Sequence, residues 1–180
     1  VTQRLELPYG ILIDRTQPRS FTFEGETLSG YKGDSVASAL VANNHWLFSR
    51  SFKYHRPRGP LSMASHDANT LVQTASTPNQ LADELPIDLN EPVSGQNYLG
   101  SLTRDWLRAL DWLGRFLPVG FYYKAFYKPF GVWRFWEPMI RQMAGLGVAN
   151  LDSKPPYRDK QYLFCDIAVI GAGPAGLSAA

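Results

Sequence analysis

Residues 20–44 read SFTFEGETLSGYKGDSVASALVANN, and this stretch predicts the architecture of the first part of the chain. Phe21 and Phe23 lie on the same side of an alternating apolar and polar run, which is typical of a half-buried strand. The turn residues Glu-Gly-Glu at 24–26 separate this run from a second short strand. The pattern predicts a β-hairpin over residues 20–31.

A helix is expected directly after the hairpin. Asp34 precedes the run SVASALVANN, and its carboxylate can accept hydrogen bonds from the free amides at the start of a helix. The residues expected on the apolar face of this helix are Val36, Ala39 and Leu40, and those suited to its end are Asn43 and Asn44.

Hairpin, helix and an irregular return through RSFKYHRPRG at 50–59 form the opening of a β-grasp domain of the ferredoxin type. The expected fold class is therefore α+β, with this domain over residues 1–95. A helical and aromatic-rich connector is expected over 96–160. The truncated start of an α/β Rossmann nucleotide-binding domain, its first strand, turn and helix, is expected over 161–180.

The expected connector contains two helices. The first covers residues 101–117, with Ser101 as its cap and an apolar stripe of Leu102, Trp106, Leu110, Leu113 and Leu117. The second is a short helix from Pro138 to Ala144. Residues 121–136 hold nine aromatic side chains among sixteen. We interpret them as packing between domains or subunits, rather than as a membrane-surface anchor or a stacking platform.

The strongest chemical motif is CDIAVIGAGPAGLSAA at 165–180, where an apolar run leads into glycines with the G-x-G-x-x-G spacing. The first glycine permits a tight turn, the second lets a pyrophosphate approach the backbone, and the third lets the helix pack on the strand. Proline suits the first helical turn. The predicted dinucleotide-binding residues are Gly171, Ala172, Gly173, Pro174, Ala175 and Gly176.

The identity of the dinucleotide stays open at this point. The acidic residue that would bind a ribose hydroxyl is expected about 20 residues after the glycines, beyond Ala180. The motif alone therefore does not separate NAD, NADP and FAD. The alternative interpretation is a strand-to-helix turn that binds no ligand.

The basic segment at 50–59 allows two interpretations. Its Arg50, Lys53, Arg56 and Arg58, beside His55, could grip an anionic cofactor or a single nucleic-acid strand. We favour a solvated or subunit-facing basic loop.

The other residues with chemical potential suggest no catalytic or metal site. His45, His55 and His66 have no metal-ligand spacing with one another or with Cys165. The sequence also lacks a nucleophile-elbow pattern. We therefore expect no catalytic residue and no metal ligand in this chain.

Composition narrows the class of protein. The 180 residues are 44% hydrophobic with a net charge of +2, too small an excess to indicate a nucleic-acid partner. The single cysteine fits a reducing compartment. The sequence contains no apolar run of the roughly 18–20 residues that cross a bilayer, so no membrane association and a cytoplasmic location are expected.

Five strings carry a family resemblance: GYKGDSVASALVANN, SRSFKYHRPRG, PVGFYYKAFYKPF, WEPMIRQMAGLG and CDIAVIGAGPAGLSAA. In order and spacing they resemble the N-terminal part of the α subunit of heterotetrameric sarcosine oxidase. The resemblance implies an oxidoreductase subunit that binds NAD and assembles with β, γ and δ subunits. FAD and FMN belong to the complex, with FMN near a subunit interface.

The implied reaction is oxidative demethylation of sarcosine to glycine. It yields H2O2, with the methyl carbon released as formaldehyde or passed to tetrahydrofolate, which like sarcosine is bound elsewhere in the complex. Related enzymes acting on N-methylglutamate, opines or hydroxyproline remain alternatives for the substrate. A non-catalytic assembly module is the alternative for this segment.

Some members of this wider family carry cysteines after the R-P-R-G string that bind a two-iron cluster. Here the stretch PLSMASHDANTLV at 60–72 has no cysteine, and clusters of this kind need several thiolates. The expectation from the sequence is therefore a ferredoxin-like domain without an iron–sulfur cluster, which disfavours electron transfer through such a cluster.

Overall fold

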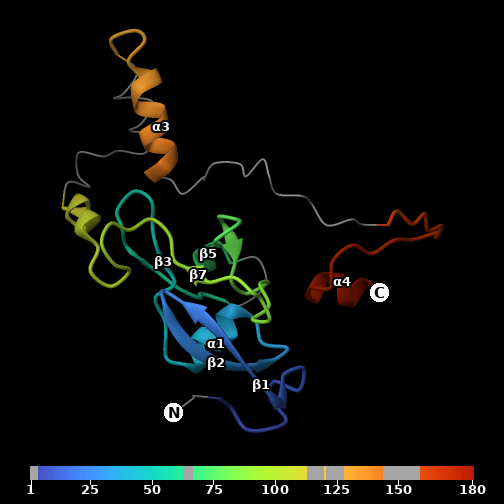
Figure 1. The fold of residues 1–180 in the computed structure, drawn as a ribbon. Helices are drawn as coiled ribbons and strands as arrows, with labels where there is room; N and C mark the ends of the chain where they lie inside the picture. The colour runs from blue at the N-terminus through green and yellow to red at the C-terminus, as the bar shows by residue number, and fades with distance from the viewer. Residues whose placement is uncertain (1–3, 63–66, 113–119, 121–127, 144–158) are drawn as a thin grey trace. The chain divides into compact units, whose positions relative to one another are not determined.

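A computed structural model describes residues 4–62, 67–112, 120, 128–143 and 159–180 (Figure 1). The chain divides into two compact units, Val1–Asn150 and Leu151–Ala180. The first unit combines a small mixed sheet with helices, so the predicted α+β class is confirmed. No helix in the described part of the chain is both long and apolar enough to cross a bilayer.

The predicted hairpin is confirmed and is longer than expected. Strand β1 (Asp14–Phe23) pairs antiparallel with β2 (Glu26–Lys32), and Phe23 lies opposite Glu26. Glu24 and Gly25 make the turn with φ angles of 52° and 81°, a left-handed pair that matches the twist of a two-residue hairpin. Glu26 therefore belongs to the second strand rather than to the turn.

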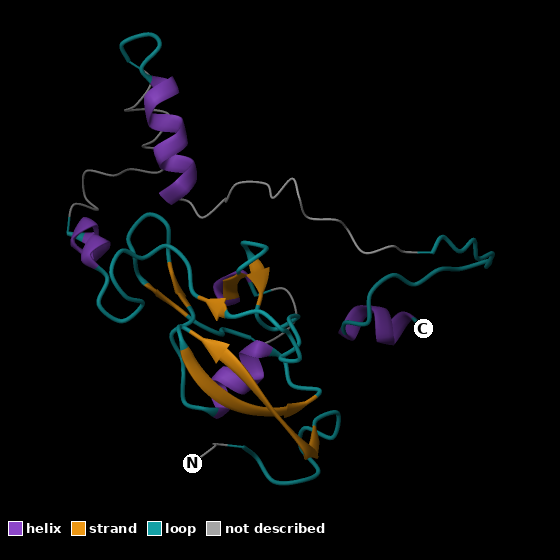
Figure 2. Ribbon diagram, viewed as in Figure 1, coloured by secondary structure: helices purple, strands orange, loops and turns teal. Residues whose placement is uncertain are grey.

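Helix α1 (Val36–Ala42) follows the hairpin and lies beside it (Figure 2). Its cap differs from the prediction: Ser35, not Asp34, accepts a hydrogen bond from the amide of Ser38, and the Ser38 hydroxyl accepts one from the amide of Ser35. This reciprocal pair is a capping box. Asp34 is buried and accepts hydrogen bonds from the Tyr31 amide and the Ser38 hydroxyl.

The remaining strands extend the sheet in the order β2-β1-β7-β5-β6. Strand β7 (Val93–Ser94) runs parallel to β1, while β5 (Leu71–Thr74) is antiparallel to both β7 and β6 (Gln80–Leu81). A short 3-10 helix, η1 (Ala68–Thr70), precedes β5. A separate two-stranded sheet joins β3 (Ser49–Arg50) to β4 (Pro57–Arg58).

The core lies between α1 and the sheet. The predicted apolar face of the helix is confirmed, because Val36, Ala39 and Leu40 are each fully buried. The largest apolar side chains that are fully buried in this cluster are Phe23, Phe48, Leu40, Ile87, Val36, Val72 and Val93.

The helix predicted over 101–117 is largely wrong in its described part. Residues 101–105 form a turn closed by a bridge between Gly100 and Asp105, and only η2 (Trp106–Asp111) is helical, as a 3-10 helix. The Asp105 carboxylate accepts the amide of Leu107 and competes with helical hydrogen bonding at this point. Residues 113–117 lie outside the described residues.

The second connector helix, α3 (Trp133–Met143), begins five residues before the predicted start at Pro138. It therefore includes the end of the aromatic segment, of which residues 121–127 lie outside the described part. Phe130 and Phe135 are exposed, so no packing of these rings within the chain is observed among the described residues.

Candidate functional site

The glycine-rich loop lies in the second unit, at the start of helix α4 (Pro174–Ala179). Gly171 has a φ of 108°, which favours glycine. A side chain on Gly176 would place its Cβ 1.9 Å from the Gly171 carbonyl oxygen. Gly173 is the helix N-cap, and a Cβ there would meet no atom within 4 Å. The loop is thus tight between its first and third glycines and open at the second.

This open side has the form that a pyrophosphate group needs, because only backbone atoms limit the approach at Gly173. Pro174 occupies the first helical turn without loss of a hydrogen bond. The residues present therefore fit a dinucleotide phosphate, and the assignment of the six residues 171–176 stays a prediction.

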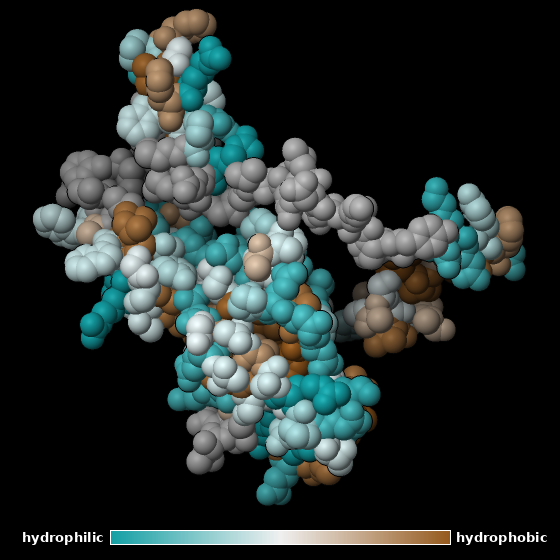
Figure 3. All heavy atoms as spheres, viewed as in Figure 1, coloured by the Kyte–Doolittle hydropathy of each residue, from teal (hydrophilic) through white to brown (hydrophobic). Residues whose placement is uncertain are grey.

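The strand expected before the loop is not formed in this chain. Ile167 and Ile170 are 83% and 97% exposed, and residues 161–170 form no strand. The apolar side chains over the second unit are visible at the surface in Figure 3. A strand exists only when paired, and none of the described strands pairs with this run. The start of a Rossmann domain is therefore not confirmed.

The basic segment at 50–59 is only partly solvated, which corrects the sequence interpretation. Arg50 is 3% exposed. Its guanidinium donates to the carbonyl oxygens of Leu102 at 2.9 Å, Thr103 at 3.1 Å and His55 at 3.1 Å. This cation therefore holds the 50–59 segment against residues 102–103 and is not available to an anionic ligand.

His55 is also buried, with Nδ1 2.8 Å from Oδ2 of Asp105. The other Asp105 oxygen accepts the amides of Leu99 at 2.9 Å and Leu107 at 3.0 Å. The pair thus connects the basic segment to residues 99–107. Among the described residues, no group of three or more histidine, cysteine or acidic side chains is placed to hold a metal ion.

The exposed part of the segment surrounds Tyr54. Lys53 Nζ lies 4.5 Å and Arg56 Cζ 4.7 Å from the centroid of its ring. Arg56 also pairs with Asp111 at 3.2 Å, and Arg58 donates to Asn69. Arg56 and Arg58 are exposed, as the sequence interpretation expected, whereas Lys53 is half-buried. All three interact with neighbouring side chains.

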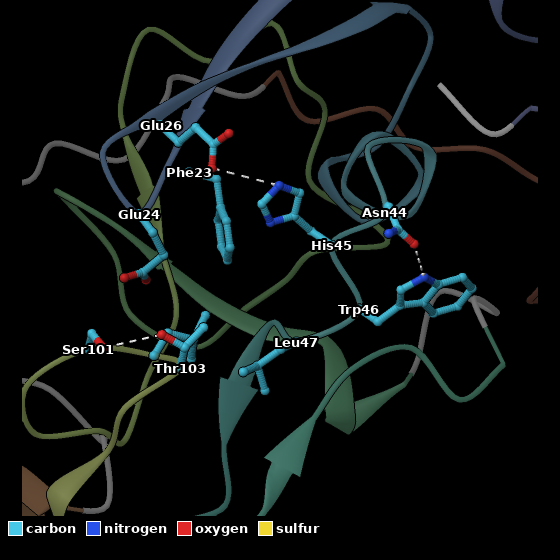
Figure 4. A pocket seen from close by; sticks show the side chains of 10 residues that line it. Phe23, Glu24, Glu26, Asn44, His45, Trp46, Leu47, Ser101 and Thr103 are labelled. Carbon is cyan, nitrogen blue, oxygen red and sulfur yellow. Dashed lines mark hydrogen bonds and ion pairs between the residues drawn. The ribbon is translucent and has the colours of Figure 1, made fainter. Parts of the chain in front are cut away.

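A cavity of about 430 Å³ lies at the end of the hairpin turn, near residues 44–47 and 101–103 (Figure 4). Glu26 points toward His45, with 3.8 Å between carboxylate and imidazole, and Trp46 donates to Asn44 at 3.0 Å. Glu24 accepts the Gly95 amide and the Tyr98 hydroxyl. Burial and the bonded Glu24 carboxylate raise the pKa of Tyr98 well above its usual value.

Sequence reasoning missed the Arg50 contacts and the His55–Asp105 pair. Asp105 lies within the helix expected over 101–117, and its separation of fifty residues from His55 leaves no local pattern. The one available signal was the unusual Arg and His content of residues 50–59.

Comparison with known proteins first defines a class. Residues 16–98, which contain the whole sheet except the start of β1, match the family model described as a 2Fe-2S iron-sulfur cluster binding domain. This match contradicts the expectation of no iron–sulfur cluster, and we correct that expectation accordingly.

We next ask whether the chain has the side chains that would hold a 2Fe-2S cluster. Cysteine thiolates hold such clusters, but the single cysteine, Cys165, is exposed and lies outside the matched residues. The side chains of residues 16–98 do not provide this ligand set by themselves. No step of the function proposed below runs through a cluster.

Similar proteins narrow the class to one kind of enzyme subunit. The chain is 43% identical over 179 residues to "Sarcosine oxidase subunit alpha" of Rhizobium meliloti (strain 1021), covering 97% of this chain and 18% of the relative. Proteins of the same name from Corynebacterium sp. strains U-96 and P-1 are 29% and 30% identical, over 95% and 93% of this chain and 14% and 13% of their own length. This chain is a relative of sarcosine oxidase α subunits, which confirms the resemblance, and it spans less than a fifth of their length.

Among solved structures, L-proline dehydrogenase from P. horikoshii is 20% identical with a TM-score of 0.41, over 49% of this chain and 17% of that one. A likeness at this level carries no argument about fold or function.

Proposed function

We propose that this chain is part of the α subunit of a heteromeric sarcosine oxidase. The observation that supports the proposal is the 43% identity over 97% of the chain. The match covers 97% of the chain, so it includes the glycine loop as well as the α+β domain.

The proposed reaction converts sarcosine, oxygen and water to glycine, formaldehyde and H2O2. The CH3–NH unit of sarcosine loses two electrons and two protons, one hydrogen from the methyl carbon and one from the nitrogen. These reduce O2 to H2O2, and water then hydrolyses the resulting imine to glycine and formaldehyde. When tetrahydrofolate is present, it takes the one-carbon unit instead. The FAD and FMN of the complex would supply the redox chemistry, and no residue of this chain is assigned to the amine-oxidising centre.

The contribution of the second unit would be the start of an NAD site. Gly171 and Gly176 hold the loop in its tight form, and Gly173 leaves the backbone open to the pyrophosphate. A phosphate at this position would lie near backbone amides at the start of a helix, where the partial positive charge favours an anion.

The contribution of the first unit would be assembly with β, γ and δ subunits. Trp106 and Trp112 are 78% and 90% exposed, and Phe130 and Phe135, further along the chain, are also exposed. Aromatic side chains exposed in this number favour a role at an interface. The alternative that the first unit is only an assembly module rests on the same side chains.

The proposal is tested by co-expressing the full-length subunit with the subunits encoded beside it and measuring oxygen consumption. Sarcosine is compared with N-methylglutamate, hydroxyproline and dimethylglycine at equal concentration. A preference for sarcosine supports the proposal. A preference for another amine would show that sarcosine is not the substrate, while the relationship to the α subunits would still hold.

A further inference from the structure

One face of η2, the yellow helical turn in Figure 1, is apolar and exposed. In a 3-10 helix, side chains three residues apart lie above one another. The amides of Arg108 and Trp112 donate to the carbonyl oxygens of Asp105 and Ala109, at 3.3 and 3.2 Å, so the three-residue repeat continues to Trp112. Trp106, Ala109 and Trp112 therefore form one line along the helix, which we call the tryptophan stripe.

The tryptophan stripe is open to solvent and continues onto the preceding turn. Both indole rings are largely exposed, and Ala109 is exposed between them. Leu99, which is 56% exposed, accepts the Trp106 amide at its carbonyl oxygen at 3.0 Å. Large apolar side chains that are exposed as neighbours, rather than singly, mark a surface that contacts another molecule.

The ring of Trp106 rests on the backbone despite its exposure. Gly100 has a φ of 104°, and a Cβ there would lie 2.7 Å from Cδ1 and 2.9 Å from Nε1 of Trp106. Only a glycine therefore leaves room for the indole to pack against this turn. A side chain that is positioned before it meets a partner loses less conformational entropy on binding.

The charges beside the tryptophan stripe are positive. Arg104 and Arg108 are exposed, and within the described ranges neither forms an ion pair. Asp111, the only acidic residue of η2, pairs with Arg56 at 3.2 Å, so these two charges cancel. Two uncompensated positive charges therefore border the apolar face.

This combination fits a protein segment with apolar and acidic side chains. Tryptophan and arginine are the side chains that contribute most to protein–protein affinity, and arginine binds carboxylates through paired hydrogen bonds. A nucleic-acid strand fits less well, because its phosphates would lie near Asp111. The net charge of +2 is also too small for such a partner.

The charges favour a segment from another subunit over one from the same chain. Unpaired charges at the rim of an interface speed up the encounter of molecules that meet by diffusion. A segment of the same chain is already present at high effective concentration and gains little from such steering.

We propose that the tryptophan stripe docks an acidic segment of another subunit. Apolar side chains of that segment pack on Trp106 and Trp112, and its carboxylates accept hydrogen bonds from Arg104 and Arg108. The inference rests on the proposed function, which makes this chain part of a heteromeric complex.

The test uses the immobilised full-length subunit, with the other subunits, co-expressed without it, as the analyte in biolayer interferometry. Trp106→Ala should weaken association at least about tenfold, the loss typical of a central interface tryptophan. Trp46→Ala is the matched control, because Trp46 is 56% exposed and lies outside the tryptophan stripe. Should Trp106→Ala fail to fold, Trp112→Ala should show the loss instead. Normal association of the folded variants, or no association of the parent subunit, would overturn the proposal.

Charge reversal tests the acidic character of the partner. The double variant Arg104→Glu/Arg108→Glu should associate more slowly than the parent, and its association rate should depend less on salt concentration. Lys32→Glu makes the same kind of change at an exposed cation of β2 and should leave both quantities unchanged. An unchanged rate and salt dependence in the double variant would contradict docking of an acidic segment.

Cross-linking identifies the occupant. Arg104→Lys and Arg108→Lys keep the charge and introduce amines, which a carbodiimide joins to nearby carboxylates as amides while the reagent becomes a urea. Peptide mass spectrometry of the assembled complex should find these amides on Asp or Glu residues of another subunit. Cross-links only within the same subunit, or a labelled dT20 strand that binds the subunit and blocks assembly, would overturn the proposal.

Oxygen consumption with sarcosine is measured separately on each complex, so the two proposals fail independently. Assembly that depends on the tryptophan stripe without sarcosine oxidation would support the docking surface and refute the proposed function. An active complex in which the tryptophan variants assemble normally would do the reverse.

Discussion

The imidazole of His55 lies 2.8 Å from the carboxylate of Asp105, with both side chains almost fully buried. Through its other oxygen, Asp105 also accepts two backbone amides. The pair therefore joins the segment after α1 to the chain that leaves the sheet domain. Together with the hydrogen bonds from Arg50 to Leu102 and Thr103, this buried pair fixes the position of residues 99–107 within the first unit.

Asp105→Ala should lower the free energy of unfolding by about 3 kcal/mol, because it leaves the imidazole and two amides unpaired inside the protein. Urea unfolding followed by tryptophan fluorescence measures the loss. Asp111→Ala is the control: Asp111 forms an exposed pair with Arg56, and its removal should cost less than about 1 kcal/mol. Equal losses of unfolding free energy for both variants would show that the buried pair does not hold residues 99–107 in place.

Asp67 gives the domain a pH dependence. Burial acts to raise the pKa of Asp67, but hydrogen bonds from the amides of Asn69, Leu61 and Ser62 outweigh it and lower the pKa to about 2. A carboxyl whose pKa is lower in the folded state stabilises that state above its unfolded pKa, near 3.9. The contribution is therefore lost as pH falls from about 4 toward 2.

Asp67→Asn should be less stable than the parent protein at pH 7, and the difference should shrink between pH 4 and 2. Urea midpoints at pH 7, 4, 3 and 2.5 measure it. Asp88→Asn, at an exposed pair with Arg19, should show little difference from the parent protein. A difference between Asp67→Asn and the parent that stays constant over this range would refute the assignment.

Gly173→Ala separates folding from cofactor binding. A Cβ at Gly173 meets no atom within 4 Å, so the melting temperature of the full-length subunit should not change without cofactor. The methyl group would occupy the space predicted for the pyrophosphate, and NAD affinity should fall about tenfold or more. Calorimetric titration with NAD measures the affinity. Ser178→Ala, which removes a hydroxyl that donates to the Pro174 carbonyl oxygen, should bind NAD normally in the same titration. Normal NAD binding by Gly173→Ala would exclude the loop from the site.

The sequence predicted those elements that depend on neighbouring residues. The hairpin follows from alternation at Phe21 and Phe23 with a Glu-Gly turn, and α1 follows from its apolar spacing. The sequence wrongly indicated Asp34 as the helix cap. Its carboxylate instead binds Arg4, which lies thirty residues away along the chain. Contacts between residues this far apart in sequence decide which of two adjacent polar residues caps a helix. A local sequence pattern does not reveal such contacts.

The same limit applies to the sites. The tight turn at the glycines could be predicted because its geometry is local to residues 171–176, and its role as a binding site stays a prediction. The His55–Asp105 pair was not predicted, because it joins segments that meet only in the fold. The expectation that the domain holds no iron–sulfur cluster was wrong for a different reason. It rested on the number of cysteines, whereas the family match rests on the sequence of residues 16–98 as a whole.

We propose above all that this chain belongs to a subunit required for sarcosine oxidation. The product balance of the purified complex with sarcosine, measured with and without the full-length subunit, tests this proposal. We expect one glycine and one H2O2 for each O2 consumed, and loss of this activity when the subunit is omitted. Full activity without the subunit, or oxygen consumption without glycine, would contradict it.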